Sequence, residues 1–279
     1  KMFCACKTKG NDEPNSRTCP VCLGHPGSKP VANKKAIDYA IKLATALNCK
    51  IAKNVIFSRK SYFYPDLAKN YQITQYEEPI GTNGYIKIGK QKIGIERVHI
   101  EEDPASLIHP GGLTNSKFVL VDYNRSGNPL VEIVTKPEIY SPSDARLFMN
   151  SLATILQYLD IFVQGENLIK ADANISIKQL NYNRAEIKNI GSFKEIKRAL
   201  EYEIERQKQL SVEQDQMQQQ TRAWNTKKGV TELLRIKETE ADYGYIFDPD
   251  LVPIEITNTM IKNIEKEIPE LPSQKYEKY

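Results

Sequence analysis

The chain has 279 residues, of which 40% are hydrophobic and 27% are charged. This composition is typical of a globular protein and provides enough apolar material for one large domain or two smaller ones. No apolar run approaches the roughly 20 residues that a membrane-spanning helix needs, so we expect no membrane partner. The net charge of +4 at pH 7 permits a nucleic-acid partner, although a mildly basic, solvated surface is the simpler explanation.

Four of the five cysteines lie in the first 22 residues, as Cys4, Cys6, Cys19 and Cys22. Two close pairs separated by turn-forming residues predict a zinc-binding knuckle over residues 1–30, closed by four thiolates. Disulfides or unpaired thiols are the alternative, but we expect no signal peptide that would direct the chain to an oxidising compartment. A closed four-thiolate site leaves no position for water, so catalysis is expected elsewhere.

The apolar periodicity predicts three helices. The first covers residues 33–48, and the second begins at Ser141, which is followed by a proline in the first turn. The third begins at Ser192, where Ser192-x-x-Glu195 is a capping box, and runs to about Gln207. The glutamine-rich stretch from Gln207 to Gln220 is predicted to be an exposed helix end or a loop.

Strand patterns fill much of the remaining sequence. Residues 51–135 contain short β-rich runs broken by Gly-Asn and Pro-Gly turns. Residues 169–178 alternate apolar and polar side chains, which predicts a half-buried strand with Lys170, Asp172 and Asn174 on its polar face. The chain is therefore expected to mix helices and sheets.

Polar residues interrupt the apolar strands at several places. In residues 93–103 the alternation puts Arg97, His99 and Glu101 on one face, and the run ends in Glu101-Glu102-Asp103. Three adjacent carboxylates repel one another, which a protein tolerates more readily where a divalent cation neutralises them. A solvated strand end is the alternative.

Glu132 lies within the apolar run 129–134, where it is either functional or a solvent-facing position of an antiparallel sheet. The strands thus offer carboxylates, amides and lysines, which are the ligands expected for magnesium and phosphates. These residues are Glu132, Asp172, Asn174, Lys188 and Asn189. The sequence has no Walker loop, Rossmann glycine fingerprint or Gly-x-Ser-x-Gly elbow. ATP, if it is used, would therefore be held by a sheet with magnesium.

Several runs carry a resemblance, among them Cys-Pro-Val-Cys-Leu-Gly-His-Pro-Gly over residues 19–27 and Arg-Lys-Ser-Tyr-Phe-Tyr-Pro-Asp-Leu over residues 59–67. The others are Lys1–Cys4, Asn33–Ala36, Tyr71–Tyr76, His99–Asp103, Val121–Gly127, Glu132–Val134, Ala171–Asn174, Glu186–Asn189, Asp248–Leu251 and Pro269–Pro272. In this order, and over nearly the whole chain, they resemble the GatB family, the B-type subunits of the tRNA-dependent amidotransferase.

The resemblance implies an α+β fold. Residues 1–253 would form a largely antiparallel, cradle-like catalytic domain with packed helices and the zinc knuckle. Residues 254–279 would begin a helical domain, truncated in this sequence. In the family a Gly-Leu-Glu-x-His strand carrying an active-site Glu and His precedes the segment matched by Lys1, and a tRNA-gripping tail follows the helical domain. We therefore expect either that the sequence covers part of a longer protein or that the fragment is inactive alone.

The resemblance also implies a reaction. Such subunits use ATP to phosphorylate the side-chain carboxylate of glutamate or aspartate misacylated onto tRNA, and ammonia displaces the phosphate. The partners would be a glutaminase (A-type) subunit, a small C-type subunit and the misacylated tRNA. The complex would work in the cytoplasm, or in an organellar matrix.

Site residues follow from the resemblance by position. Glu101, Glu102 and Glu132 would hold magnesium or line the transamidation pocket, with His99 beside them and Lys60 facing phosphate or the substrate carboxylate. Asp172, Asn174, Lys188 and Asn189 would contact ATP. Zinc would be structural.

Two other classes stay open. A zinc-containing RNA-binding module would use the carboxylates only as surface charge, and a carboxylate-amine ligase could act on a free small molecule. Convergence of Glu101, Glu102 and Glu132 in one magnesium shell would favour the active-site interpretation. The aromatic residues between Tyr62 and Tyr76 are predicted either to contact the partner subunit or to form a local core.

Overall fold

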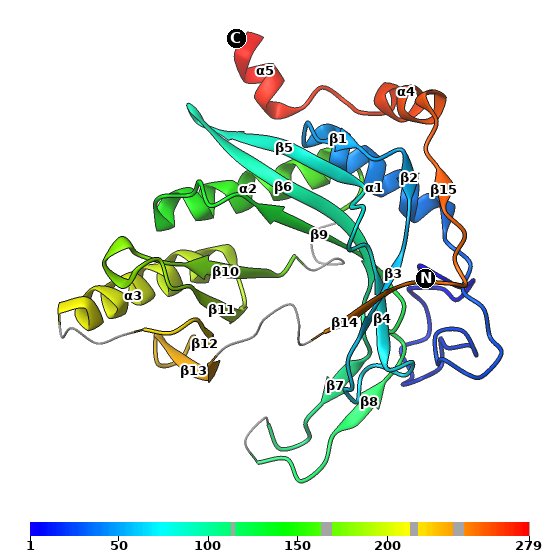
Figure 1. The fold of residues 1–279 in the computed structure, drawn as a ribbon, viewed down its shortest axis with the longest axis horizontal. Helices are drawn as coiled ribbons and strands as arrows, with labels where there is room; N and C mark the ends of the chain where they lie inside the picture. The colour runs from blue at the N-terminus through cyan, green and yellow to red at the C-terminus, as the bar shows by residue number, and fades with distance from the viewer. Residues whose placement is uncertain (113–114, 163–168, 213–216, 237–242, 279) are drawn as a thin grey trace. The chain divides into compact units, whose positions relative to one another are not determined.

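The computed structural model describes residues 1–112, 115–162, 169–212, 217–236 and 243–278. The chain divides into two compact units, whose helices and strands are labelled in Figure 1. Unit 1 comprises Lys1–Tyr85, Gly94–Thr135 and Tyr243–Pro269. Unit 2 comprises Ile86–Ile93, Lys136–Asp242 and Glu270–Tyr279.

Unit 1 contains two helices and most of the strands. The helices are α1 (Lys34–Ala46) and α4 (Asn258–Lys266). The strands are β1 (Lys50–Ile51), β2 (Asn54–Val55), β3 (Ser58–Ser61), β4 (Tyr71–Thr74), β7 (Ser106–Ile108), β8 (Leu120–Asp122), β9 (Pro129–Thr135), β14 (Gly244–Phe247) and β15 (Ile254–Glu255). Strands β5 (Gly81–Ile88) and β6 (Gln91–Glu102) belong to unit 1 except at their connection, residues 86–93.

The first helix forms where the sequence predicts it. The Asn33 side chain caps α1 by accepting hydrogen bonds from the backbone N–H groups of Lys35 and Ala36. Its apolar stripe, including Ile37 and Ile41, is buried, and α4 packs beside α1 (Figure 1). The chain leaves the helix through Asn48, whose φ of 57° suits an asparagine better than most residues.

Two sheets of unit 1 position the residues discussed below. One has the order β1-β5-β6-β9, in which β6 and β9 are antiparallel. The other has the order β14-β3-β4, with both pairs antiparallel. Smaller antiparallel pairs join β15 to β2 and β7 to β8.

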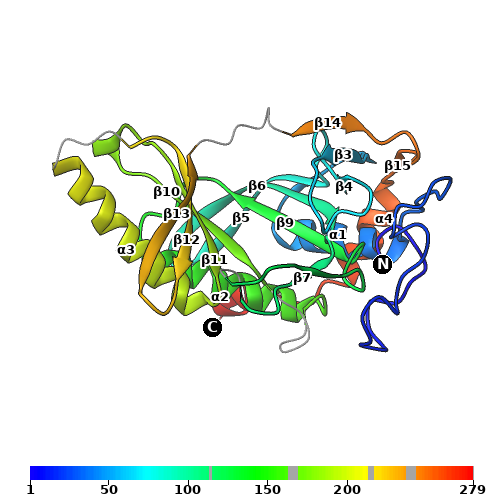
Figure 2. The same ribbon diagram turned by 90° about the horizontal axis from the view of Figure 1, so that it is seen from below.

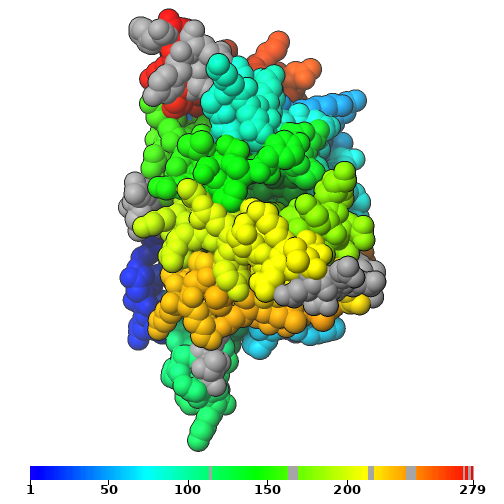
Figure 3. Space-filling model, turned by 90° about the vertical axis from the view of Figure 1, so that its left-hand side faces the viewer, coloured from blue at the N-terminus to red at the C-terminus, as the bar shows by residue number. Residues whose placement is uncertain are grey.

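Unit 2 is a four-stranded sheet with helices. Its elements are α2 (Pro142–Tyr158), β10 (Ala171–Ile175), the 3-10 turn η1 (Lys178–Leu180), β11 (Ala185–Ile190), α3 (Phe193–Val212), β12 (Gln220–Asn225), β13 (Val230–Ile236) and α5 (Pro272–Lys278). Helix α3 packs against β10, β11 and β13 (Figure 2), and in the space-filling view it lies beside the β12–β13 hairpin (Figure 3, yellow and orange).

The sheet order is β10-β11-β12-β13. Only the β11–β12 pair of this sheet is parallel, while its neighbours are antiparallel. A parallel pair needs a crossover connection, and α3 provides it between the two strands. The structure thus shows an α+β fold with largely antiparallel sheets.

Helices α2 and α3 also begin as predicted. Ser141 Oγ accepts from the Asp144 N–H at 3.1 Å, and Ser192 Oγ accepts from the Glu195 N–H at 3.3 Å. Helix α3 continues to Val212, so residues 208–212 form a helix end, as predicted, and Lys208, Gln209 and Val212 are exposed. Gln207 itself is fully buried, which the prediction of an exposed stretch missed. Gln207 Nε2 donates to Glu203 Oε1 at 3.0 Å, whereas Gln207 Oε1 is buried and has no partner among the described residues. Sequence composition alone assigns this amide to solvent. Residues 213–216 of the glutamine-rich stretch lie outside the described residues.

Residues 254–279 contain β15, α4 and α5, and a separate helical domain there stays a prediction. Among the described helices, none combines the length and apolar character needed to cross a membrane.

Candidate functional site

His99, Glu101 and Glu132 meet in unit 1. His99 and Glu132 are direct partners across the antiparallel β6–β9 pair, and Glu101 lies two residues along the same face of β6. His99 Nε2 is 3.6 Å from Glu132 Oε2 and 3.9 Å from Glu101 Oε2. Ligand atoms of the three side chains all lie within 4.8 Å of one another, a spacing that suits a shared metal ion.

Burial and neighbouring charges shift the pKa values of two members of this cluster, Glu101 and His99. Burial and the charge of Glu132 raise the pKa of Glu101 to about 7, although Lys60 and a hydrogen bond from Thr74 act in the opposite direction. Burial, with smaller contributions from Arg97 and Lys60, lowers the pKa of His99 to about 4. The imidazole is therefore neutral at pH 7, and its contacts with the two carboxylates are not ion pairs.

His99 Nδ1 is buried and has no hydrogen-bond partner within the part of the chain that the structure describes. A buried polar atom without a partner is uncommon and needs an explanation. It is Nε2, however, that faces the two carboxylates. A cation shared with them would be held by the lone pair of Nε2 and would not give Nδ1 a partner.

Lys60 approaches the same group from β3. Its Nζ lies 4.5 Å from the ring centre of Tyr243 and 5.9 Å from that of Tyr62. Those two rings meet edge to face with their centres 5.8 Å apart. Because the charge of Lys60 lowers the pKa of both His99 and Glu101, the ammonium lies within electrostatic range of the cluster.

Glu102 does not join this group, which corrects the expected convergence of Glu101, Glu102 and Glu132. Its side chain is buried and forms a salt bridge with Lys69, and Glu102 Oε1 also accepts from the Ile73 N–H at 2.9 Å. Successive side chains of a strand point to opposite faces, so a residue next to Glu101 cannot share its face. His99 takes the third place in the cluster instead.

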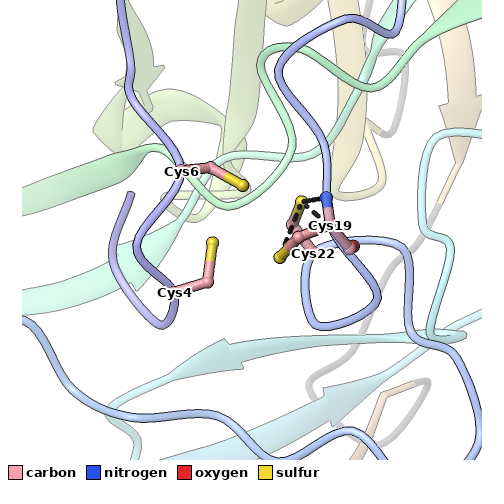
Figure 4. Close-up of side chains that lie close together, drawn as sticks. All are labelled: Cys4, Cys6, Cys19 and Cys22. Carbon is pink, nitrogen blue, oxygen red and sulfur yellow. Dashed lines mark hydrogen bonds between the residues drawn. The ribbon is translucent and has the colours of Figure 1, made fainter.

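The four N-terminal cysteines converge as predicted. Figure 4 shows Cys4 and Cys6 on one segment and Cys19 and Cys22 on a neighbouring loop, with their sulfur atoms close together. The four ligand atoms lie within 4.8 Å of one another, and all four thiols are free of disulfides. The Cys19 N–H donates to Cys22 Sγ at 3.1 Å. The hydrogen bond between Cys4 and Cys22 lowers the pKa of Cys22 and raises that of Cys4, because the two sulfurs share one proton when no metal is bound.

The sequence was compared with known protein families. A family model described as the GatB/GatE catalytic domain matches residues 1–262. The chain belongs to this family.

Curated relatives agree with this GatB/GatE assignment. All three described here are B-type subunits of an aspartyl/glutamyl-tRNA(Asn/Gln) amidotransferase. The one from Sulfolobus acidocaldarius is 50% identical over 281 residues, which are 98% of this chain and 59% of the relative. The one from Saccharolobus solfataricus is 48% identical, covering 100% of this chain and 60% of the relative. The one from Moorella thermoacetica is 47% identical, and the match covers 98% of this chain and 59% of the relative. The chain thus spans about 60% of the length of these relatives.

The remaining predicted residues of this GatB/GatE chain lie in unit 2. Asp172 and Asn174 are exposed on β10, as the strand pattern predicts. Lys188 on β11 lies 3.6 Å from Asp172 Oδ2 and 3.5 Å from Glu186 Oε1. Burial alone would lower the pKa of Lys188, but these two carboxylates raise it. Asn189 is exposed and has a φ of 64°.

Sequence reasoning missed two neighbours of the cluster. Thr74 Oγ1 donates to Glu101 Oε2 at 3.3 Å, and Tyr243 flanks Lys60. Thr74 carries little sequence signal, because its strand, Tyr71–Thr74, mixes polar and apolar residues and its burial is seen only in the structure. Tyr243 carries no local signal, because it comes to Lys60 only through the pairing of β14 with β3.

Proposed function

We propose that this chain is the catalytic part of a GatB-type amidotransferase subunit. It would activate the side-chain carboxylate of glutamate or aspartate misacylated onto tRNA with ATP, through an acyl phosphate, and transfer ammonia to it. The observation that carries the proposal is the grouping of His99, Glu101 and Glu132 near Lys60 in a chain of the GatB/GatE family.

The cluster fits a divalent cation. Two carboxylates that repel each other, with Nε2 of a neutral imidazole 3.6 and 3.9 Å from them, form a donor set that a cation would stabilise. Magnesium bound there would polarise the transferred phosphoryl group and offset its charge. Glu101 and Glu132 would hold it, with His99 completing the set.

Lys60 would bind the substrate carboxylate or the phosphate. A fixed ammonium stabilises charge that develops on a phosphoryl or acyl oxygen. The adjacent rings of Tyr62 and Tyr243 restrict its position, so that little reorganisation is needed when the substrate arrives. Burial raises the pKa of Tyr62 well above its usual range, so this flank stays uncharged.

We assign the cysteine cluster to structural zinc. Four sulfurs within 4.8 Å of one another, on two loops of one unit, match the donor set of a closed tetrahedral site. In unit 2 we place an ATP contact at Asp172, Asn174, Lys188 and Asn189. The salt bridges of Lys188 would hold its ammonium in place for a phosphate. We also propose that residues 254–279 start a helical domain.

The proposed partners are a glutaminase (A-type) subunit, a C-type subunit and misacylated tRNA. Neutral ammonia is the nucleophile, and a sheltered path from a glutaminase would deliver it before water hydrolyses the acyl phosphate. Phe63 and Tyr64 are 84% and 57% exposed, which makes them candidates for the partner contact. The reaction belongs to protein synthesis, so we place the complex in the cytoplasm.

The test uses the full-length protein with misacylated tRNA, ATP and magnesium. We expect amide formation with ammonium salts, and glutamine use only when the glutaminase partner is present. Glu132→Gln should abolish amide formation while tRNA affinity stays within a few fold. Normal turnover of Glu132→Gln with weaker tRNA binding would favour the RNA-binding alternative, and turnover of free glutamate would favour the small-molecule ligase.

A further inference from the structure

Lys1 is a buried charged residue beside the cysteine cluster. It is only 4% exposed, and its Nζ donates to Cys22 Sγ at 3.6 Å and to the Tyr123 carbonyl oxygen at 3.2 Å. Its own carbonyl accepts from Asn33 Nδ2 at 3.0 Å, and its backbone nitrogen donates to the Cys6 carbonyl at 2.7 Å. A buried ammonium is costly unless it has partners, so its position next to a sulfur needs an explanation.

Charge supplies that explanation. Four thiolates around one divalent ion leave a net charge of −2, which is unfavourable in a partly buried site. An ammonium that donates to one sulfur offsets part of this charge and fixes the direction of that ligand.

The other acceptor of the Lys1 ammonium, the Tyr123 carbonyl oxygen, belongs to the turn between β8 and β9. This turn, residues 123–127, makes several further hydrogen bonds to the knuckle, and three of them involve Met2, Cys22 and Asn15. The Met2 N–H donates to the Gly127 carbonyl at 2.7 Å, Ser126 Oγ donates to the Cys22 carbonyl at 3.1 Å, and the Tyr123 N–H donates to Asn15 Oδ1 at 2.7 Å. The turn continues directly into β9, which carries Glu132.

Gly127 suits the backbone conformation of this turn. Its φ is 79°, and a β-carbon there would lie 3.5 Å from Cys22 Cβ and 3.6 Å from Lys1 Cδ. The left-handed backbone rather than the space explains the glycine, because other residues adopt this conformation only with strain.

We propose that Lys1 stabilises the metal-bound form of the cysteine cluster and joins the metal centre to the turn that leads into β9. The inference rests on the zinc assignment made above. The knuckle would then have a role beyond its own stability, because the presence or absence of bound zinc would determine how well ordered residues 123–127 are.

The first experiment measures the rate at which zinc passes from the full-length protein to a coloured chelator. Lys1→Met should release zinc about 10- to 100-fold faster than the wild type, the usual cost of removing a partner of a metal ligand. Lys1→Arg, which keeps the charge and a donor, should recover part of the difference. The matched control Lys7→Met removes an exposed lysine of the same segment and should leave the rate unchanged.

Release from Lys1→Met within twofold of the wild type would overturn the inference while leaving the zinc assignment intact. Wild-type protein purified without zinc would overturn both.

A second measurement needs no variant. Zinc removal from the wild type should speed hydrogen exchange at the Met2 and Tyr123 amides and leave the Ile187 amide of β11, in unit 2, unchanged. Unchanged exchange at Met2 and Tyr123 would contradict the proposed coupling between the metal centre and the turn at residues 123–127.

Discussion

Glu101 and Glu102 are adjacent in the chain, but their carboxylates lie on opposite faces of β6. Glu101 Oε2 is 3.9 Å from His99 Nε2, whereas Glu102 is bound by Lys69 and the Ile73 N–H. The first belongs to a group with excess negative charge, and the second has a complete set of partners. Substitutions at the two positions should therefore have opposite effects.

Glu101→Gln should stabilise the cation-free protein and abolish its response to magnesium. Above the raised pKa of about 7 the buried carboxylate is ionised at a cost to the folded state, so the neutral amide should raise the free energy of unfolding at pH 8 by about 3 kcal/mol. At pH 4 the carboxyl is protonated and the difference should vanish. Thermal unfolding of the full-length protein, with EDTA and then with magnesium, measures both effects.

The matched control is Glu96→Gln, an exposed position of the same strand. It should change neither the stability by more than about 0.5 kcal/mol nor the magnesium response. A magnesium response retained by Glu101→Gln would remove this residue from the cation site.

Glu102→Gln should destabilise the protein by about 3 kcal/mol, because Lys69 would keep a largely buried charge without its partner. Magnesium should still stabilise this variant. The double variant Glu102→Gln with Lys69→Met should recover part of the loss in a double-mutant cycle measured by urea unfolding. Additive losses would show that the two side chains do not interact.

Cys19→Ser should lose zinc and lower the unfolding temperature, since metal binding and folding of a small lobe are coupled. Elemental analysis of freshly purified protein should find one zinc per chain in the wild type and less in the variant. Cys49→Ser is the control, because Cys49 lies outside the cluster and should leave the zinc content unchanged. Wild-type protein with four titratable thiols and no metal would contradict the assignment.

The buried carboxyl of Glu203 should make the stability of unit 2 depend on pH. Burial alone would raise the pKa of this carboxyl, but hydrogen bonds from Arg206, Gln207 and Thr231 lower it. The unfolded chain therefore binds the proton more readily, so the stabilisation is fully present above the ordinary pKa of about 4.3 and is lost as the pH falls through the lower folded value.

Glu203→Gln should cost about 3 kcal/mol at pH 7 and less at acid pH, measured by urea unfolding over pH 2–7. The control Glu205→Gln changes an exposed carboxylate of the same helix. Its free energy of unfolding should stay within about 0.5 kcal/mol of the wild-type value. Equal losses for the Glu203 variant at pH 2 and pH 7 would exclude an ionic role.

Local signals predicted much of this structure. Asn33, Ser141 and Ser192 cap helices because a short polar side chain next to an apolar repeat satisfies free N–H groups, which depends only on nearby residues. The alternation of β6 likewise put His99 and Glu101 on one face. The same alternation excludes Glu102 from that face, so its assignment to the cluster came from family resemblance and not from strand geometry.

What could not be predicted depends on contacts between distant segments. Glu132 faces His99 only in one register of β6 and β9, and that register includes an irregularity between Ile95 and Arg97. The partner of Glu102 and the burial of Gln207 likewise depend on residues from other turns and strands. Composition describes a residue's preference, but tertiary partners decide where it lies.

The late return of β14 to β3 affects how this protein is made. A ribosome releases the chain from its N-terminal end, so β3 and β4 leave it long before Tyr243 and β14. Until then they form a two-stranded pair, which is marginal by itself. The segments for the cysteine cluster and the His99–Glu132 pair are all complete by residue 135, whereas the surroundings of Lys60 must wait for residues 243–247. A nascent chain can therefore assemble its two candidate metal sites while Lys60 has only Tyr62, and not yet Tyr243, beside it.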